Sequence, residues 1–217
     1  WSVRIRFSAS LRSTGETEPE ATMGRSRPIK PERVALFGGT FDPVHLGHTE
    51  IARAARNSLQ LDLVVFIPCR QSPHKDAPTV ATQEQRLAML ALALAAESWA
   101  TISDIELRLP QPSFSWLTAE ALSQTYPDSN LYWLMGADQW DTIEQWERPS
   151  HLSELVEFIV HARDKEPADK NGFCAHHITG QHPASASEIR KQPHARSSEE
   201  WLHPDVARYL KEESIYS

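Results

Sequence analysis

The chain has 217 residues, of which 40% are hydrophobic and 24% charged, and its net charge is −7. This length suits one domain that buries roughly 70% of its unfolded surface, while two cysteines, Cys69 and Cys174, are too few for a disulfide framework and favour the reducing cytoplasm. The acidic balance disfavours nucleic acid as a partner, and no apolar run approaches the ~20 residues that cross a bilayer, so no membrane partner is expected.

The first 32 residues differ in composition from the rest. They mix Ser, Arg, Glu, Thr and Pro without long apolar periodicity, and they lack the apolar core of a secretory signal. We therefore predict a disordered or leader segment over residues 1–32 and a folded domain over residues 33–217. The arginines leave an organelle-transit segment as one alternative, and a start at Met23 is another.

From Arg33 onward, short apolar runs alternate with stretches of helical periodicity. Strands are predicted, in chain order, at residues 34–37, 63–67, 102–107, 131–135, 156–160 and 173–178. Helices are predicted at residues 46–59, 83–96, 115–125, 187–191 and 204–212. Strands separated by crossover helices predict an α/β domain with a mostly parallel sheet and helices on both faces.

The residues after the first predicted strand are the most informative, because ligands of such sheets bind at the carboxyl ends of the strands. Gly38, Gly39, Thr40, Phe41 and Asp42 come first, followed by the letters PVHLGH. Two glycines let the backbone approach a phosphate, and the segment opens a helix whose N-terminal N–H groups favour anions. His45 and His48 lie three positions apart and share one face of that first turn.

This segment resembles the His-x-Gly-His signature of nucleotidylyltransferases, and its form GGTFDPVHLGH is similar to bacterial nicotinate-nucleotide adenylyltransferases. The resemblance extends over about residues 34–216. It implies a single Rossmann-like domain that transfers the adenylyl group of ATP to nicotinate mononucleotide, giving deamido-NAD and pyrophosphate. The resemblance implies that residues 38–41 bind ATP. It also implies that Asp42 lies by the mononucleotide, although stabilising the helix start is an alternative role for this residue.

Two further segments resemble parts of that family that lie by the nucleotide. The letters SPHK end at Lys75, which can place a cation over the triphosphate, although a lone lysine of this kind is more often a surface residue. Gly136 and Asp138 follow the strand at 131–135 and match a Gly-x-Asp motif whose aspartate and backbone contact the nucleotide. The resemblance therefore implies ATP binding by Gly136 and Asp138.

The mononucleotide is implied to bind at two other segments. Ser113, Phe114 and Ser115 stand where the family has Ser-Tyr-Thr, and Ser115 is a suitable N-cap of the helix at 115–125. The resemblance implies that free N–H groups there donate hydrogen bonds to the nicotinate carboxylate. Trp146 stands where the family has a tryptophan that stacks on the nicotinate ring; a buried structural anchor is an equal alternative. Trp140 and Trp133 compete for the role, although the mid-strand position of Trp133 favours the core.

Near the C-terminus, the letters ASASEIR resemble the family's Ile-Ser-Ser-Thr-x-Ile-Arg motif. Ser187 stands in the threonine position, and Arg190 supplies a charged fork for phosphate oxygens. The alternative for this segment is a capped helix with a solvated arginine.

These assignments define a mechanism without a covalent intermediate. The phosphate oxygen of the mononucleotide attacks the α-phosphorus of ATP, and positioning and charge stabilisation supply the catalysis. His45 and His48 contact phosphates, and Lys75 and Arg190 support the leaving pyrophosphate. Mg²⁺ is expected as the cofactor, bound mainly through ATP phosphates and water, with no metal ligands from the protein.

Other functions are less consistent with the sequence. Nicotinamide mononucleotide or phosphopantetheine are alternative acceptors, and a nucleotide-binding sensor without turnover is an alternative of another class. A related synthetase fold that recognises RNA would need a basic surface. A soft-metal cluster at residues 174–177 is not expected, because neighbouring residues of a strand point to opposite faces. The oligomeric state is left open.

Overall fold

The computed structural model describes residues 30–71, 78–163 and 166–216, and these form one parallel sheet covered by helices. The strand order is β3-β2-β1-β4-β5-β6, and every neighbouring pair is parallel. The strands are β1 (Arg33–Gly39), β2 (Leu63–Pro68), β3 (Ala100–Ile102), β4 (Asn130–Gly136), β5 (Glu157–Ala162) and β6 (Ala175–Thr179). The order reverses between β1 and β4, which is the Rossmann arrangement expected from the sequence.

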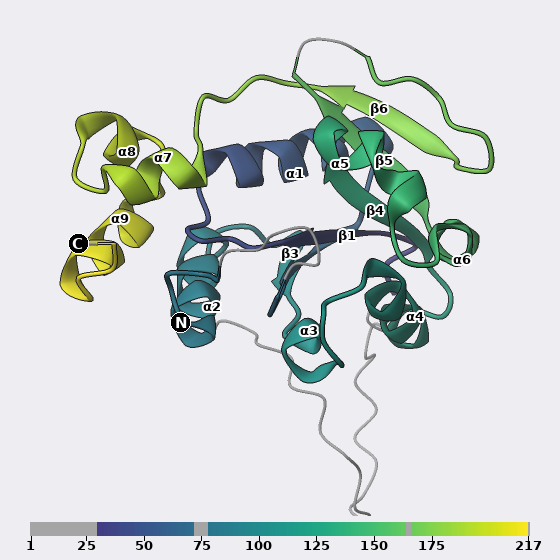
Figure 1. The fold of residues 1–217 in the computed structure, drawn as a ribbon, viewed down its shortest axis with the longest axis horizontal. Helices are drawn as coiled ribbons and strands as arrows, with labels where there is room; N and C mark the ends of the chain where they lie inside the picture. Colours follow the sequence, from purple (N-terminus) through teal and green to yellow (C-terminus); the bar gives the residue numbers. More distant parts are fainter. Residues whose placement is uncertain (1–29, 72–77, 164–165, 217) are drawn as a thin grey trace, which may run out of the picture.

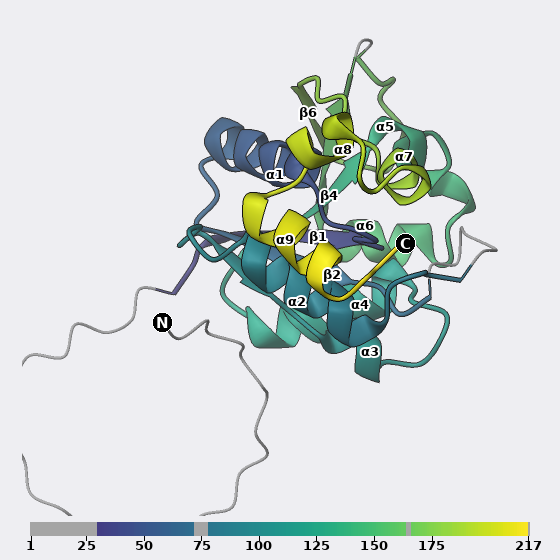
Figure 2. The same ribbon diagram turned by 90° about the vertical axis from the view of Figure 1, so that its left-hand side faces the viewer.

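Helices cover both faces of this sheet, as predicted (Figures 1 and 2). The helices are α1 (Leu46–Leu59), α2 (Gln83–Ala93), α3 (Ile105–Arg108), α4 (Ser115–Thr125), α5 (Ala137–Asp141), the 3₁₀ helix η1 (Ile143–Gln145), α6 (Pro149–Leu155), α7 (Ala186–Lys191), α8 (Arg196–Glu200) and α9 (Pro204–Glu212). One core lies under α1, α2 and α9, and it includes Phe37, Phe66 and Leu134. The other lies under α4, α5 and α6, and it includes Trp133 and Phe158.

Local chemistry accounts for several helix starts. Thr82 precedes α2, where its Oγ1 accepts from the backbone N of Gln85 at 3.2 Å and its own N donates to Gln85 Oε1 at 2.9 Å. This reciprocal pair satisfies two of the N–H groups that a helix start leaves without partners. Pro149 and Pro204 open α6 and α9, where the missing N–H of proline has no cost.

The predicted strand at residues 102–107 is wrong over most of its length. Only Ala100–Ile102 pairs with β2, after which Ser103 N donates to the oxygen of Phe66 and the chain turns into α3. The buried carboxyl of Glu106 then accepts a hydrogen bond from Thr118 Oγ1 at 2.8 Å. Tertiary pairing with α4 therefore overrides the apolar alternation of this short segment.

The described part of the chain begins with three residues of the predicted leader. Lys30 forms an exposed ion pair with Asp128 at 2.6 Å, and Asp62 Oδ2 accepts from the backbone N of Glu32 at 2.8 Å and of Arg33 at 3.0 Å. Residues 1–29 lie outside the described part of the chain. Among the described residues, no helix is both long and apolar enough to span a membrane.

Candidate functional site

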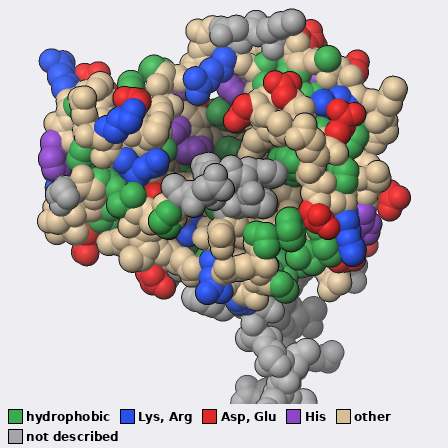
Figure 3. Space-filling model, viewed as in Figure 1, with side chains coloured by type: hydrophobic (Ala, Val, Ile, Leu, Met, Phe, Trp, Pro, Cys, Tyr) green, Lys and Arg blue, Asp and Glu red, His purple; other side chains and the backbone are tan. Residues whose placement is uncertain are grey.

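The predicted nucleotide-binding segments meet where the strand order reverses. β1 ends at Gly39, its neighbour β4 ends at Gly136, and α7 approaches the same end of the sheet after β6 (Figure 1). In Figure 3 this side of the molecule is hollowed, and histidine side chains lie within the hollow. The topology thus brings residues from distant parts of the sequence to one edge of the sheet.

The turn after β1 is held by close packing of Gly39 against Phe41. A Cβ built on Gly39 would lie 2.8 Å from the Phe41 ring, so no other residue fits without displacing that buried ring. Phe41 itself has a left-handed backbone, with φ of 48°. The aromatic ring of Phe41 is 1% exposed and packs edge-on against His48, with 5.1 Å between ring centroids. Phe41 therefore supports His48 with its buried side chain.

His45 and His48 lie together, as their spacing predicts. Their rings are stacked with 3.8 Å between centroids, and the backbone N of His45 donates to His48 Nδ1 at 3.2 Å. Because His48 Nδ1 accepts this bond, the neutral ring carries its proton on Nε2. His45 is the N-cap residue of α1, and His48, at the third helical position, accepts from the N-cap backbone as in a capping box. The pair thus stands at a helix N-terminus, where backbone N–H groups favour an anion.

Burial makes His45 a neutral side chain. Desolvation, with the positive fields of His182 and Arg163 adding to it, lowers the pKa of His45 from 6.5 to about 3. Its Nδ1 is buried and has no hydrogen-bond partner among the described residues. A buried ring nitrogen without a partner is costly, so a ligand oxygen or water at this position would be stabilising.

The carboxylate of Asp42 joins two distant segments of the chain by hydrogen bonds. It accepts from the backbone N of Val80 at 2.9 Å, from that of Ala81 at 3.0 Å, and from Tyr216 Oη at 2.6 Å. The backbone oxygen of Asp42 accepts from Arg190 Nη1 at 2.6 Å. Asp42 therefore lies in the site, but three donors already surround its carboxylate.

Arg86 is a buried residue to which the sequence assigned no role. It is 0% exposed, and its Nη1 donates to the backbone oxygens of Thr40 at 2.8 Å and Cys69 at 2.7 Å. This guanidinium fastens the turn after β1 to the end of β2 and places a fixed positive charge beneath it. Its neighbour Glu106 is desolvated, which raises the pKa of that carboxyl from 4.5 to about 7.

The loop before α4 departs from one detail of the prediction. Phe114, with φ −78° and ψ 129°, is the N-cap residue, and Ser115 is the first helical residue, so the expected Ser115 cap is wrong. No side chain caps this helix, which leaves its first N–H groups without a partner from within the helix. Ser113 is buried, and its Oγ accepts from the backbone N of Arg70 at 3.3 Å. Ser113 thus organises the loop.

The remaining predicted residues occupy different environments. Asp138 is exposed in the first turn of α5, one residue beyond Ala137, and Gly136 is the N-cap of that helix. Trp146 is 8% exposed and packs in the core under α4, α5 and α6, so its unliganded position is that of an anchor. Ser187 is exposed on α7, with its Oγ 2.8 Å from that of Ser185. Lys75 lies outside the described residues.

Sequence reasoning missed two basic residues that the fold brings to His45 and one tyrosine that it brings to Asp42. His182 lies beside His45, since a Cβ on Gly47 would be 3.1 Å from one ring and 3.3 Å from the other. Arg163 follows β5 and contributes a positive field at His45. Tyr216 comes from the penultimate position of the chain. Each stands outside a recognisable motif, so only its tertiary position reveals it.

Comparison with known proteins is consistent with this geometry. The cytidylyltransferase-like family model matches residues 36–192. A probable nicotinate-nucleotide adenylyltransferase from Methylacidiphilum infernorum is 34% identical over 187 residues, covering 85% of this chain and 92% of that protein. One from Hydrogenobaculum sp. is 35% identical over 190 residues, covering 85% and 98%.

A solved structure resembles the fold. The Plasmodium falciparum nicotinic acid mononucleotide adenylyltransferase in complex with NaAD superposes with a TM-score of 0.71 at 18% identity, covering 85% of this chain and 97% of that one. Fold, site and sequence match together define a nucleotidyltransferase of the cytidylyltransferase-like class. Within that class, the chain belongs to the nicotinate-nucleotide adenylyltransferase family.

Proposed function

We propose that this protein transfers the adenylyl group of ATP to nicotinate mononucleotide, releasing pyrophosphate and forming deamido-NAD in NAD biosynthesis. The observation that carries the proposal is the stacked pair His45 and His48 at the N-terminus of α1, at the point where strand order reverses. The family to which the chain belongs catalyses this class of reaction.

The nucleophile is a phosphate oxygen of the mononucleotide, which is already anionic at neutral pH and needs no strong base. The P–O bond to the α-phosphorus forms as the bond to the pyrophosphate breaks, so the enzyme contributes orientation and charge stabilisation. Neutral His45 and the Nε2–H of His48 donate hydrogen bonds to phosphate oxygens. Arg190 adds a fixed positive charge, and we assign the same role to Lys75.

ATP binding is assigned to the turn at residues 38–41, to Gly136 and Asp138, and to Ser187. The close approach of the backbone at Gly39 supports phosphate contact there. The exposed positions of Asp138 and Ser187 leave their polar groups accessible to a ligand.

The nicotinate carboxylate is assigned to the N-terminus of α4. Phe114 leaves this 11-residue helix without a side-chain cap, so the first N–H groups, with that of Ser115 foremost, face the loop. A carboxylate gains hydrogen bonds there that a neutral amide accepts less strongly. Ser113 holds the loop, and Trp146 supports the ring from the adjacent core, with stacking on the ring as the proposed liganded role.

Mg²⁺ is proposed as the cofactor, bound mainly through ATP phosphates and water, where it neutralises charge on the phosphates. The environment of Asp42 supports this mode, because its carboxylate already accepts three hydrogen bonds from the protein. A cytoplasmic location and a division into a leader over residues 1–32 and a catalytic domain over residues 33–217 complete the proposal.

The test is pyrophosphate release from ATP and Mg²⁺ with either nicotinate or nicotinamide mononucleotide. We expect faster release with the nicotinate form and a loss of about 10²–10³ in kcat for His48→Ala, the cost of removing one transition-state donor. His151→Gln is the matched control, because this histidine lies on α6 beside Glu120 and Glu154.

Each other outcome has a defined meaning. Preference for the nicotinamide form would retain the mechanism and overturn the role of the α4 N-terminus. Tight ATP binding without release from either acceptor would contradict the proposal and favour a sensor or another acceptor.

A further inference from the structure

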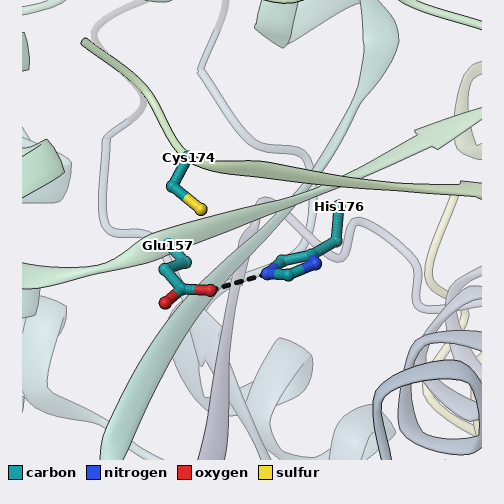
Figure 4. Close-up of side chains that lie close together, drawn as sticks. All are labelled: Glu157, Cys174 and His176. Atoms are coloured by element: carbon teal, nitrogen blue, oxygen red, sulfur yellow. Dashed lines mark hydrogen bonds and ion pairs between the residues drawn. The ribbon is translucent and has the colours of Figure 1, made fainter.

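A second group of chemically reactive side chains lies at the opposite end of the sheet from the histidine pair. Glu157 begins β5, Cys174 immediately precedes β6, and His176 follows two residues later (Figure 4). One ligand atom from each of the three side chains lies within 4.8 Å of the others. Glu157 Oε2 and His176 Nε2 are already 2.6 Å apart.

The strand register explains why these three side chains converge. Phe158 pairs with Ala175 and Ile159 with His176, so Glu157 and Cys174 stand opposite each other one position earlier. Side chains two positions apart share a face of a strand, which places Cys174 and His176 together. His177 points the other way, where its Nε2 lies 3.3 Å from Asp169 Oδ1. Alternation therefore separates His177 from the group, but it does not separate Cys174 from His176.

We propose that Glu157, Cys174 and His176 bind one divalent transition-metal ion of the zinc type. Sulfur, imidazole nitrogen and a carboxylate oxygen are the ligands that zinc takes in proteins, and hard ions such as Mg²⁺ do not favour this set. Bonds of about 2.0–2.3 Å in tetrahedral geometry put neighbouring ligand atoms roughly 3.3–3.8 Å apart. The three ligand atoms thus need to move by about an ångström, which side-chain rotation allows without movement of the strands.

Binding replaces protons by the metal. The thiol of Cys174 loses its proton to solvent, and Nε2 of His176 loses the proton that it shares with Glu157, so that the nitrogen lone pair faces the metal. One thiolate and one carboxylate then balance the two positive charges of the ion. Cys174 is exposed and Glu157 and His176 are half-buried, so metal and a fourth ligand, water, can enter from solvent.

This metal site is distinct from the nucleotide site and would act on the fold. Glu157 is the first residue of β5, whereas the fifth, His161, pairs with Gly136 at the end of β4 that meets the nucleotide site, and four residues of strand span about 13 Å. The ion would clip the outer strand β6 to β5 at the end where β6 begins. It is therefore a stabilising site for the sheet edge, and it makes no contact with reacting phosphates.

The experiment is a titration of the full-length, chelator-treated protein with Co²⁺, followed by displacement with Zn²⁺. We expect one equivalent of Co²⁺ to produce the near-ultraviolet charge-transfer absorption of a cobalt–thiolate bond, and Zn²⁺ to abolish it. Cys174→Ser should lose the band. His176→Gln should weaken Zn²⁺ binding at least about 10- to 100-fold, since even residues that only orient ligands have effects of that size.

His177→Gln is the matched control, because it removes an adjacent histidine on the opposite face and should leave the affinity unchanged. Zn²⁺ should raise the melting temperature of the wild type and of His177→Gln but not of Cys174→Ser. Pyrophosphate release should be the same in Cys174→Ser as in the wild type, which separates this test from that of the enzyme. A missing band in the wild type, a band retained by Cys174→Ser, or equal Zn²⁺ affinities in the wild type and His176→Gln would overturn the proposal.

Discussion

Arg190 Nη1 donates a hydrogen bond of 2.6 Å to the backbone oxygen of Asp42, although the two residues are 148 positions apart. The bond fastens α7 to the turn that precedes His45, while Tyr216 fastens the end of the chain to the carboxylate of the same aspartate. The C-terminal segment thus closes over the turn after β1. Arg190 has further N–H groups beyond the one used here, and these can meet a phosphate.

Replacing Arg190 should impair catalysis more than folding. We expect Arg190→Ala to lower kcat/KM by about 10²–10³, because the pyrophosphate loses contact with one fixed positive charge. The kcat/KM of Arg190→Lys should lie between those of Arg190→Ala and the wild type. Steady-state pyrophosphate release measures this. Lys191→Ala is the control, since Lys191 is an exposed residue paired with Glu188. Equal losses in the two alanine variants would contradict a specific role for Arg190.

Tyr216→Phe tests whether the end of the chain supports the site. Burial, and then the neighbouring Asp42, raise the pKa of Tyr216, so its hydroxyl remains a donor at all ordinary pH values. Removing it leaves the Asp42 carboxylate with two backbone donors and should lower the free energy of unfolding by about 1–2 kcal/mol. Urea unfolding should show no more than about 0.5 kcal/mol for Tyr209→Phe, in which a more accessible hydroxyl is lost. Equal effects would argue against the Asp42 bond.

Much of the fold could be predicted because its signals are local. The strand at 34–37, the helix at 46–59 and the strand at 131–135 have unambiguous periodicity, and the structure places β1, α1 and β4 there. The prediction of a strand at 102–107 was wrong because this apolar spacing fits either a strand or a helix. The tertiary hydrogen bond from Thr118 to Glu106 favours the helix. The short helices α5, α6 and α8 were missed because each is too brief to show a period.

In the candidate site, too, the residues that could be predicted are those with a local signal in the sequence. His45 and His48 were predictable because three residues of helix spacing bring them together. Arg86, by contrast, has the sequence context of an ordinary polar residue on an amphipathic helix. Its role in joining the segments after β1 and β2 becomes visible only in the folded chain. The same holds for Cys174 and His176, whose third partner comes from a neighbouring strand.

Glu106→Gln should alter the pH dependence of stability. Burial raises the folded pKa of Glu106 from 4.5 to about 7, so the folded state binds more protons between these values. Stability contributed by the neutral carboxyl is complete below about pH 4.5 and is lost as pH rises through about 7. The glutamine variant avoids this loss and should be roughly 1–3 kcal/mol more stable than the wild type at about pH 8 and equal to it near pH 4.5.

Urea unfolding across this pH range measures the difference. Glu120→Gln is the control, because Glu120 is exposed on the neighbouring α4 and should change stability by no more than about 0.5 kcal/mol at either pH. A variant whose stability parallels that of the wild type across the range would show that Glu106 is not the titrating group.

The neutral state of His45 should respond to phosphate. In the free protein its folded pKa of about 3 lies below the usual 6.5, so between these values the unfolded state binds the extra proton and stability is lost as pH falls from 6.5. A triphosphate beside the ring adds negative charge that favours the imidazolium and should raise the pKa of His45 by about 1–3. Neutral adenosine, which carries no such charge, should leave this pKa unchanged. NMR titration of the ring protons, with His45→Gln to assign the resonance, measures both values. An unchanged His45 titration with bound ATP would mean that the phosphates lie elsewhere, because a charge in hydrogen-bond contact with a buried ring must shift its proton affinity.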